Sequence, residues 1–133
     1  DRLVGVVRAG HPLSQQRMTL ARYRKAEHVV VSRSGFEEGA VERPYLPADL
    51  QRKIGTIVSG FSAALALARA SELVATVPDR HTAKLRRGMF VFALPVPTQE
   101  FTVSMLWHPR VDADPAHRWL RACLRKVCTS STG

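Results

Sequence analysis

Small hydroxyl residues occur at two points where a β-rich apolar run of the sequence gives way to a loop. Ser59-Gly60-Phe61-Ser62 follows one such run, and Ser32 and Ser34 follow another. Turns of this kind present serine hydroxyls and free backbone N–H groups, which suit an anionic group such as a carboxylate. The ring of Phe61 suits an aromatic group. The residues therefore favour binding of a small organic molecule, with two alternatives open: Ser59 caps the following helix, or Phe61 belongs to the core.

The sequence lacks the patterns of known catalytic and metal sites. Its five histidines and two cysteines show neither HExxH nor CxxC spacing. Gly-x-Ser-x-Gly, the phosphate-binding P-loop and Gly-x-Gly-x-x-Gly are also missing, and no base is identified to activate a serine. We therefore expect no enzyme activity, no cofactor and no metal ion. His28, at the start of an expected strand, is a further candidate for a hydrogen bond to a ligand.

Two cysteines, Cys123 and Cys128, lie on one expected helix near the end of the chain. A separation of five positions places them roughly 140° apart around a helix axis, so they cannot pair with each other. We expect reduced thiols.

The chain is basic, with a formal net charge of +9 from 20 Lys and Arg against 11 Asp and Glu. The tightest basic groups, among them Arg22-Tyr23-Arg24-Lys25 and Arg86-Arg87, lack interleaved base-stacking aromatics and lie in no helix-turn-helix motif. Solvated basic faces explain them more simply than direct DNA binding does. General basicity still favours attraction to nucleic acid over a distance.

Neither a membrane span nor a signal peptide is indicated. Hydrophobic residues make up 45% of the chain, but the longest apolar run, residues 63–68, is far shorter than the roughly 18 to 20 residues that cross a bilayer. The opening Asp1-Arg2-Leu3-Val4 has no signal-peptide layout. We expect a piece of a cytoplasmic protein.

Strands and helices alternate along the sequence. An interrupted helix is expected within residues 36–50, where Pro44 and Pro47 break the pattern. Strands are expected at residues 3–7, 28–32, 53–58, 73–77, 90–94 and 102–107, and helices at 19–24, 63–70, 78–87 and from 114 to about 127. This order indicates an α/β fold with largely parallel sheets, in which ligands bind at the carboxyl ends of strands beside helix amino termini.

Several stretches, in this order, resemble the carboxy-terminal effector-binding domain of LysR-type bacterial transcriptional regulators. The resemblance is most specific near the end of the chain, where the sequence is typical of the branch that holds nodulation and aromatic-degradation regulators. The matching stretches are residues 3–7 with Gly10-His11-Pro12-Leu13, residues 28–32, residues 59–64 with 70–78, and Leu106-Trp107-His108-Pro109-Arg110 with 114–121.

The resemblance implies a type 2 periplasmic-binding-protein-like fold, with two lobes of mostly parallel sheets and the effector in the cleft between them. Residues 28–90 then form lobe two, and residues 1–27 and 91–133 form part of an incomplete lobe one. The effector-binding positions that it implies are Ser32, Ser34, Ser59, Phe61 and Ser62, with His28 as an additional candidate.

The same resemblance implies a role in transcription regulation. The effector is expected to be a small organic molecule, aromatic or carboxylated. Contact with DNA is expected only through an amino-terminal winged helix-turn-helix, which has no counterpart in these residues, and the parent protein is expected to be a homodimer or homotetramer without membrane contact. The alternative function is a solute-binding protein of a transport system, which has the same fold.

Overall fold

The structure of the chain, a computed structural model, describes residues 1–33, 41 and 43–130. It divides into two compact units, Asp1–Phe101 and Thr102–Gly133. Among the described residues, no helix is long and apolar enough to cross a membrane.

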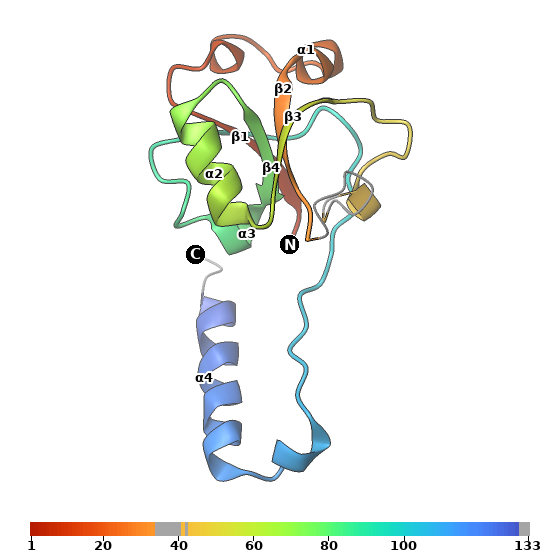
Figure 1. Ribbon diagram of the computed structural model, residues 1–133. Coiled ribbons are helices and arrows are strands. Elements are labelled where there is room, and N and C mark those ends of the chain that lie inside the picture. The colour runs from red at the N-terminus through yellow and green to blue at the C-terminus, as the bar shows by residue number, and fades with distance from the viewer. Residues whose placement is uncertain (34–40, 42, 131–133) are drawn as a thin grey trace. The chain divides into compact units, whose positions relative to one another are not determined.

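The first unit is built on one five-stranded sheet with the strand order β3-β2-β4-β1-β5 (Figure 1). The strands are β1 (Leu3–Val7), β2 (Glu27–Val31), β3 (Lys53–Val58), β4 (Val74–Pro78) and β5 (Phe90–Phe92). β2 pairs in parallel with β3 and β4, whereas β1 is antiparallel to both β4 and β5. The expected parallel pairing therefore extends to β2 and its neighbours but not to β1. β1 is buried along its whole length, so its sequence is an apolar run like that of a central parallel strand. Such a run does not indicate whether the strand pairs in parallel or antiparallel.

The described residues form three α-helices in the first unit, α1 (Leu20–Lys25), α2 (Phe61–Ala70) and α3 (Asp79–Thr82), and one in the second unit, α4 (Pro115–Ser130). The expected cap of α1 is confirmed, since Thr19 Oγ1 accepts a hydrogen bond of 3.3 Å from the backbone N–H of Arg22. The expected helix over 78–87 is helical only to Thr82 and continues as turns to Gly88, whose φ of +74° ends it.

The amino terminus of α3 is capped from a distant part of the chain. Both carboxylate oxygens of Asp1 accept backbone N–H bonds, from Arg80 at 2.9 Å and from His81 at 3.1 Å. The cap therefore comes from a residue that is close to α3 in space but far from it in sequence.

Only part of the expected interrupted helix over 36–50 falls on described residues. Residues 34–40 and 42 lie outside them, and a 3-10 turn over Arg43–Tyr45 contains Pro44.

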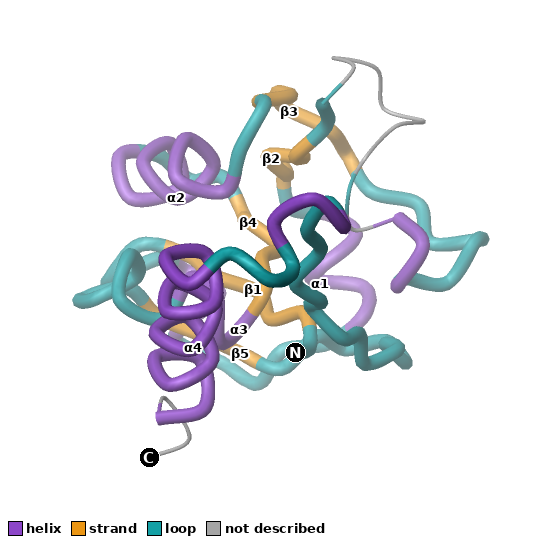
Figure 2. Tube along the Cα trace, turned by 90° about the horizontal axis from the view of Figure 1, so that it is seen from below, coloured by secondary structure: helices purple, strands orange, loops and turns teal. Residues whose placement is uncertain are grey.

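The two faces of the sheet hold separate core clusters because successive side chains of a strand point to opposite faces. On one face, α2 packs Ala64, Leu65 and Ala68 against the strands. On the other, Tyr23 of α1 packs with Val7, Leu13, Val74 and Phe92. Figure 2 shows α2 and α1 on different sides of the strands. The sheet is thus covered on both faces.

In the second unit, the expected strand over 102–107 is not formed. These residues have no regular secondary structure, and the side chains of Val103 and Leu106 are 76% and 91% exposed. A strand needs a neighbour for its N–H and C=O groups, and within the described part of the chain this segment has none. The expected final helix is confirmed as α4, and Asp114 Oδ1 accepts from the backbone N–H of His117 at 2.7 Å.

Candidate functional site

Two of the predicted hydroxyl segments meet at one edge of the sheet. β2 and β3 are parallel neighbours, and Val31 lies opposite Val58 in their register. Ser32 and Ser59 directly follow these two residues, and the backbone N–H of Ser32 donates to the carbonyl of Val58 at 2.9 Å. The carboxyl ends of parallel strands therefore bring these two segments together, as the sequence predicts.

The segment Ser59-Gly60-Phe61-Ser62, which we call the 59–62 turn, forms the start of α2. Gly60 is the residue before the first helical turn, with extended φ and ψ of −162° and 160°. Its carbonyl accepts from the backbone N–H of Ala64 at 3.1 Å. Among the described residues no side chain caps this helix, so Ser59 does not play the capping role that the sequence left open. The N–H groups of the first turn, which the helix itself cannot pair, suit an acceptor from a ligand.

The two serine side chains of the 59–62 turn contribute little to the packing of the fold. Ser59 and Ser62 are exposed. A Cβ added at Gly60 would meet no atom within 4 Å, so the space beside the turn is open. Two exposed hydroxyls and the positive end of the helix dipole thus belong to the same turn, which suits an anionic group.

Phe61 has two roles. It is half-buried and packs against the core cluster on the α2 face of the sheet, so the core interpretation holds in part. Its ring also lies 6.1 Å from that of His81, centroid to centroid, at 70°. His81 is exposed on α3, and sequence reasoning missed it because twenty residues separate it from Phe61. Only the order β2-β4 in the sheet brings α3 beside the start of α2.

The remaining predicted residues have different surroundings. Ser32 is buried, with 1% of its surface exposed, at the end of β2. Ser34 lies outside the described residues.

His28 lies at the amino end of β2, opposite the end that carries Ser32. It is fully buried, its Nε2 donates to the carbonyl of Tyr23 at 2.7 Å, and its ring stacks edge-on against that of Tyr23 at 4.5 Å. The structure thus does not bring His28 together with the serines.

Burial controls the ionisation of His28. Removal from water lowers the pKa of this imidazole to about 4; the hydrogen bond to Tyr23 opposes the shift and the charge of Arg52 adds to it. Its Nδ1 is buried with no hydrogen-bond partner among the described residues. The ring is therefore a neutral packing element near pH 7.

The chemistry of the site is that of binding. Within the described ranges no three His, Cys, Asp or Glu side chains group closely enough to hold a metal ion. The 59–62 turn combines hydroxyls, free N–H groups, a half-buried phenyl ring and a nearby imidazole, which together suit a carboxylate attached to a ring.

Comparisons with known proteins match the chain to one domain of transcriptional regulators. Residues 1–129 match the family described as the LysR substrate binding domain. The HTH-type transcriptional regulator LinR of Sphingobium indicum is 35% identical over 125 residues, which cover 91% of this chain and 41% of LinR. The chain thus spans about two fifths of the length of this relative.

Solved structures agree with this match. A crystal structure of a transcriptional regulator from Vibrio parahaemolyticus superposes with a TM-score of 0.76 at 28% identity, over 97% of this chain and 61% of that one. The regulatory domain of MexT, a transcriptional activator of Pseudomonas aeruginosa, gives a TM-score of 0.68 at 29% identity, over 92% and 62%. These similarities confirm the α/β fold that the resemblance implied.

Proposed function

Because this chain belongs to the LysR substrate-binding domain family, and is therefore an effector-binding domain of transcriptional regulators and not an enzyme, we propose that the 59–62 turn holds its effector. The solute-binding alternative is not favoured, since the matching relatives are regulators of transcription.

The uncapped amino terminus of α2 carries the proposal. Helices often receive a side-chain acceptor at this position, but a glycine there costs only roughly a few tenths of a kcal/mol, so the fold tolerates free N–H groups at this helix end. Here Gly60 provides no side-chain acceptor, while Ser59 and Ser62 are exposed beside it. An effector carboxylate would accept the free N–H groups and complete the helix end. Phe61 and His81 would contact the remainder of the molecule, so the favoured effector is an aromatic carboxylate.

The other predicted effector contacts differ in position and burial, and we propose different roles for them. Ser32 lies at the same end of the strands, and as a buried residue it would contact the effector from the inner side of the site. Ser34 is included on the family resemblance alone. His28 would act only indirectly, because its ring lies at the other end of β2 and bonds to Tyr23.

For the whole protein, we propose the arrangement that the family resemblance implies. Residues 28–90 would belong to lobe two, and residues 1–27 and 91–133 to lobe one, with the effector between the lobes. A preferred affinity for one lobe arrangement would couple effector binding to the geometry of a homodimer or homotetramer. DNA recognition would reside in an amino-terminal helix-turn-helix domain, and the protein would act in the cytoplasm.

The test is binding of three small probes to the 133-residue chain, followed by isothermal calorimetry and thermal shift. Benzoate combines a ring with a carboxylate, cyclohexanecarboxylate removes the aromaticity, and benzamide removes the charge. We expect benzoate to bind most tightly and benzamide least. The double variant Ser59→Ala/Ser62→Ala should weaken benzoate binding about tenfold or more, since each lost hydrogen bond to a charged group is worth about 1.5 to 3 kcal/mol.

Ser14→Ala provides the matched control. This serine donates to the carbonyl of His11 at 2.7 Å, away from the 59–62 turn, so benzoate affinity should stay unchanged. Equal affinity for all three probes, or an undiminished affinity in the double variant, would contradict the proposal.

A further inference from the structure

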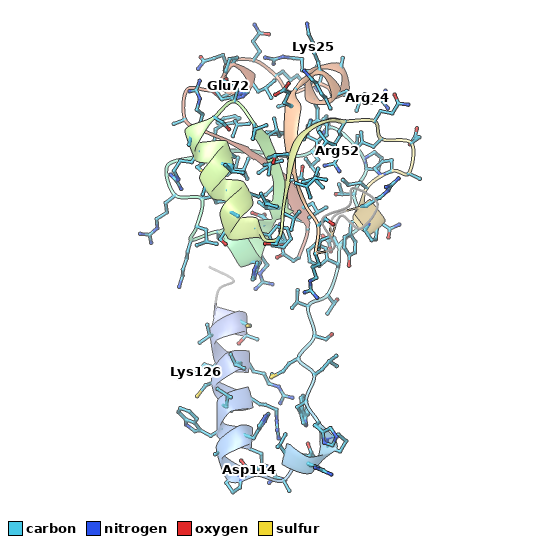
Figure 3. The ribbon with its side chains drawn as sticks, viewed as in Figure 1. Arg24, Lys25, Arg52, Glu72, Asp114 and Lys126 are labelled. Atoms are coloured by element: carbon cyan, nitrogen blue, oxygen red, sulfur yellow. The ribbon has the colours of Figure 1, made fainter. Side chains whose placement is uncertain are left out.

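A cluster of basic side chains lies at the end of the first unit where α1 packs. We call it the α1 basic surface and define it by Arg17, Arg24, Lys25 and Arg52. Figure 3 shows Arg24, Lys25 and Arg52 together at this end. Arg17, Arg24 and Lys25 are exposed. Residues 12–26 contain four basic residues, counting Arg22, and no Asp or Glu.

Two acidic side chains near this surface, those of Glu27 and Glu72, form ion pairs with other residues. Glu27, which follows α1, forms an ion pair with Lys53, whose Nζ lies 2.6 Å from Oε1 of Glu27. Glu72 is held by Arg8 and by His11, with His11 Nε2 lying 3.3 Å from its carboxylate. The positive charge of Arg17, Arg24 and Lys25 is thus not cancelled by these two carboxylates, and it remains directed to solvent.

The backbone beneath the α1 basic surface is held in place. Arg22 reaches back from α1, and its guanidinium donates to the carbonyls of Arg17 at 2.9 Å and Pro12 at 3.2 Å. Thr19 caps the same helix, and Tyr23 anchors it through a 2.8 Å hydrogen bond to Thr76. The exposed basic side chains therefore project from a fixed platform, which lowers the entropy cost of binding an extended anion.

The α1 basic surface is separate from the 59–62 turn. β2 and β3 begin at Glu27 and Lys53, beside α1, and run in parallel to Val31 and Val58, beside the turn. The basic surface and the turn thus lie beyond opposite ends of the same two strands, so one can be changed without altering the other.

We infer that the α1 basic surface contacts the phosphate backbone of duplex DNA. Regulators of transcription work next to DNA, so a secondary contact forms at high local concentration. Flexible exposed Arg and Lys side chains suit phosphates. Tyr23, the aromatic residue of this segment, is fully buried and cannot stack on bases, which disfavours single strands. The contact strengthens binding without reading sequence.

A second basic segment, residues 80–87, provides the comparison. Arg86 of this segment is bound to Asp79, and its guanidinium also donates to the Asp79 carbonyl at 2.6 Å. Arg69 donates to the carbonyls of Arg87 and Leu85, both at 2.9 Å, so it serves to hold the turn. Lys84 and Arg87 are exposed, however, and form a matched pair to Lys25 and Arg24.

The experiment measures binding of the 133-residue chain to a short, fluorescently labelled DNA duplex of arbitrary sequence. Binding is followed by fluorescence anisotropy at several salt concentrations. Arg24→Ala/Lys25→Ala and Lys84→Ala/Arg87→Ala each remove one Lys and one Arg, so each lowers the formal charge from +9 to +9 − 2 = +7. We expect the first pair to weaken binding roughly tenfold or more at low salt and to reduce the slope of log K against log salt by about 2. The second pair should leave both values near those of the unchanged chain.

Absence of duplex binding, or an equal loss of duplex binding in both double variants, would overturn the inference. It would also be overturned if Arg24→Ala/Lys25→Ala weakened binding to phosphatidylglycerol vesicles, tested in parallel, but not binding to the duplex. Equal losses would mean that only total charge matters. Circular dichroism against temperature verifies that both variants fold.

Discussion

At the scale of single residues, His28 links stability to pH. Its folded pKa is about 4, whereas an unfolded histidine titrates near 6.5. Between these values the unfolded chain binds more protons, so the free energy of unfolding falls as pH falls through this window. The full effect is about 3 kcal/mol, present above pH 6.5 and lost toward pH 4. Urea unfolding at several pH values measures it.

His28→Gln is the matching variant, because a glutamine amide can still donate to the Tyr23 carbonyl but does not titrate. We expect the stability of this variant to depend less on pH between about 4 and 6.5. The same pH dependence in both proteins would show that other groups control it.

Gly5 is a residue whose missing side chain matters. A Cβ at this position of β1 would lie 2.2 Å from Cζ of Phe92 on the neighbouring strand β5. Gly5→Ala should therefore destabilise the protein by about 1 to 3 kcal/mol through overpacking. A double-mutant cycle measured by urea unfolding tests the cause: in the Phe92→Ala background, the same change should cost much less. Additive costs would place the strain elsewhere.

At the scale of elements, Arg121 holds the loop before α4 to the helix. Its side chain is 8% exposed, and its guanidinium donates to the carbonyls of Val111 at 3.2 Å and Asp112 at 2.8 Å. The same group lies 4.5 Å over the ring of Trp107, which itself donates to the Asp112 carboxylate. These contacts join residues 107–112 to α4 within the second unit.

Arg121→Lys should loosen this join, because lysine keeps the charge but loses the planar fork and the stacked face. We expect amide hydrogens of residues 107–121 to exchange several-fold faster. Arg125→Lys, at an exposed position of the same helix, is the control and should leave exchange unchanged. Equal rates in the two variants would show that Arg121 acts only through its charge.

Sequence reasoning succeeds where a signal is local. The Thr19 cap, the amphipathic stripe of α4 and the apolar runs of β2 and β3 each lie within a few residues, and each element forms as predicted. Residues 102–107 contain β-branched and apolar side chains that suit a strand, but strand formation depends on a neighbour that local sequence does not reveal.

The candidate site divides in the same way. The meeting of Ser32 and Ser59 follows from parallel strands and is predictable, whereas the approach of His81 to Phe61 depends on strand order. His28 was a candidate contact, but the side of β2 on which it is buried is set by packing against Tyr23. Tertiary contacts therefore decide what the residue types leave open.

At the scale of the whole molecule, the division into two units has a direct consequence. In the described part of the chain, all five strands and both core clusters lie within Asp1–Phe101. We expect residues 1–101 alone to fold with a cooperative thermal transition, since removal of 102–133 takes away no strand of the sheet. Circular dichroism against temperature checks this, and a chain without a transition would show that the second unit is needed for folding.

The open surroundings of the 59–62 turn also bear on how such domains diverge. Ser59 and Ser62 are exposed, Gly60 has free space around it, and none of the three supports the core. Substitutions at these positions therefore meet little selection against unfolding. A lineage can change the chemical preference of this turn by successive point mutations while the buried strands beneath it remain unchanged. Such a turn can adapt to new molecules faster than the scaffold that carries it.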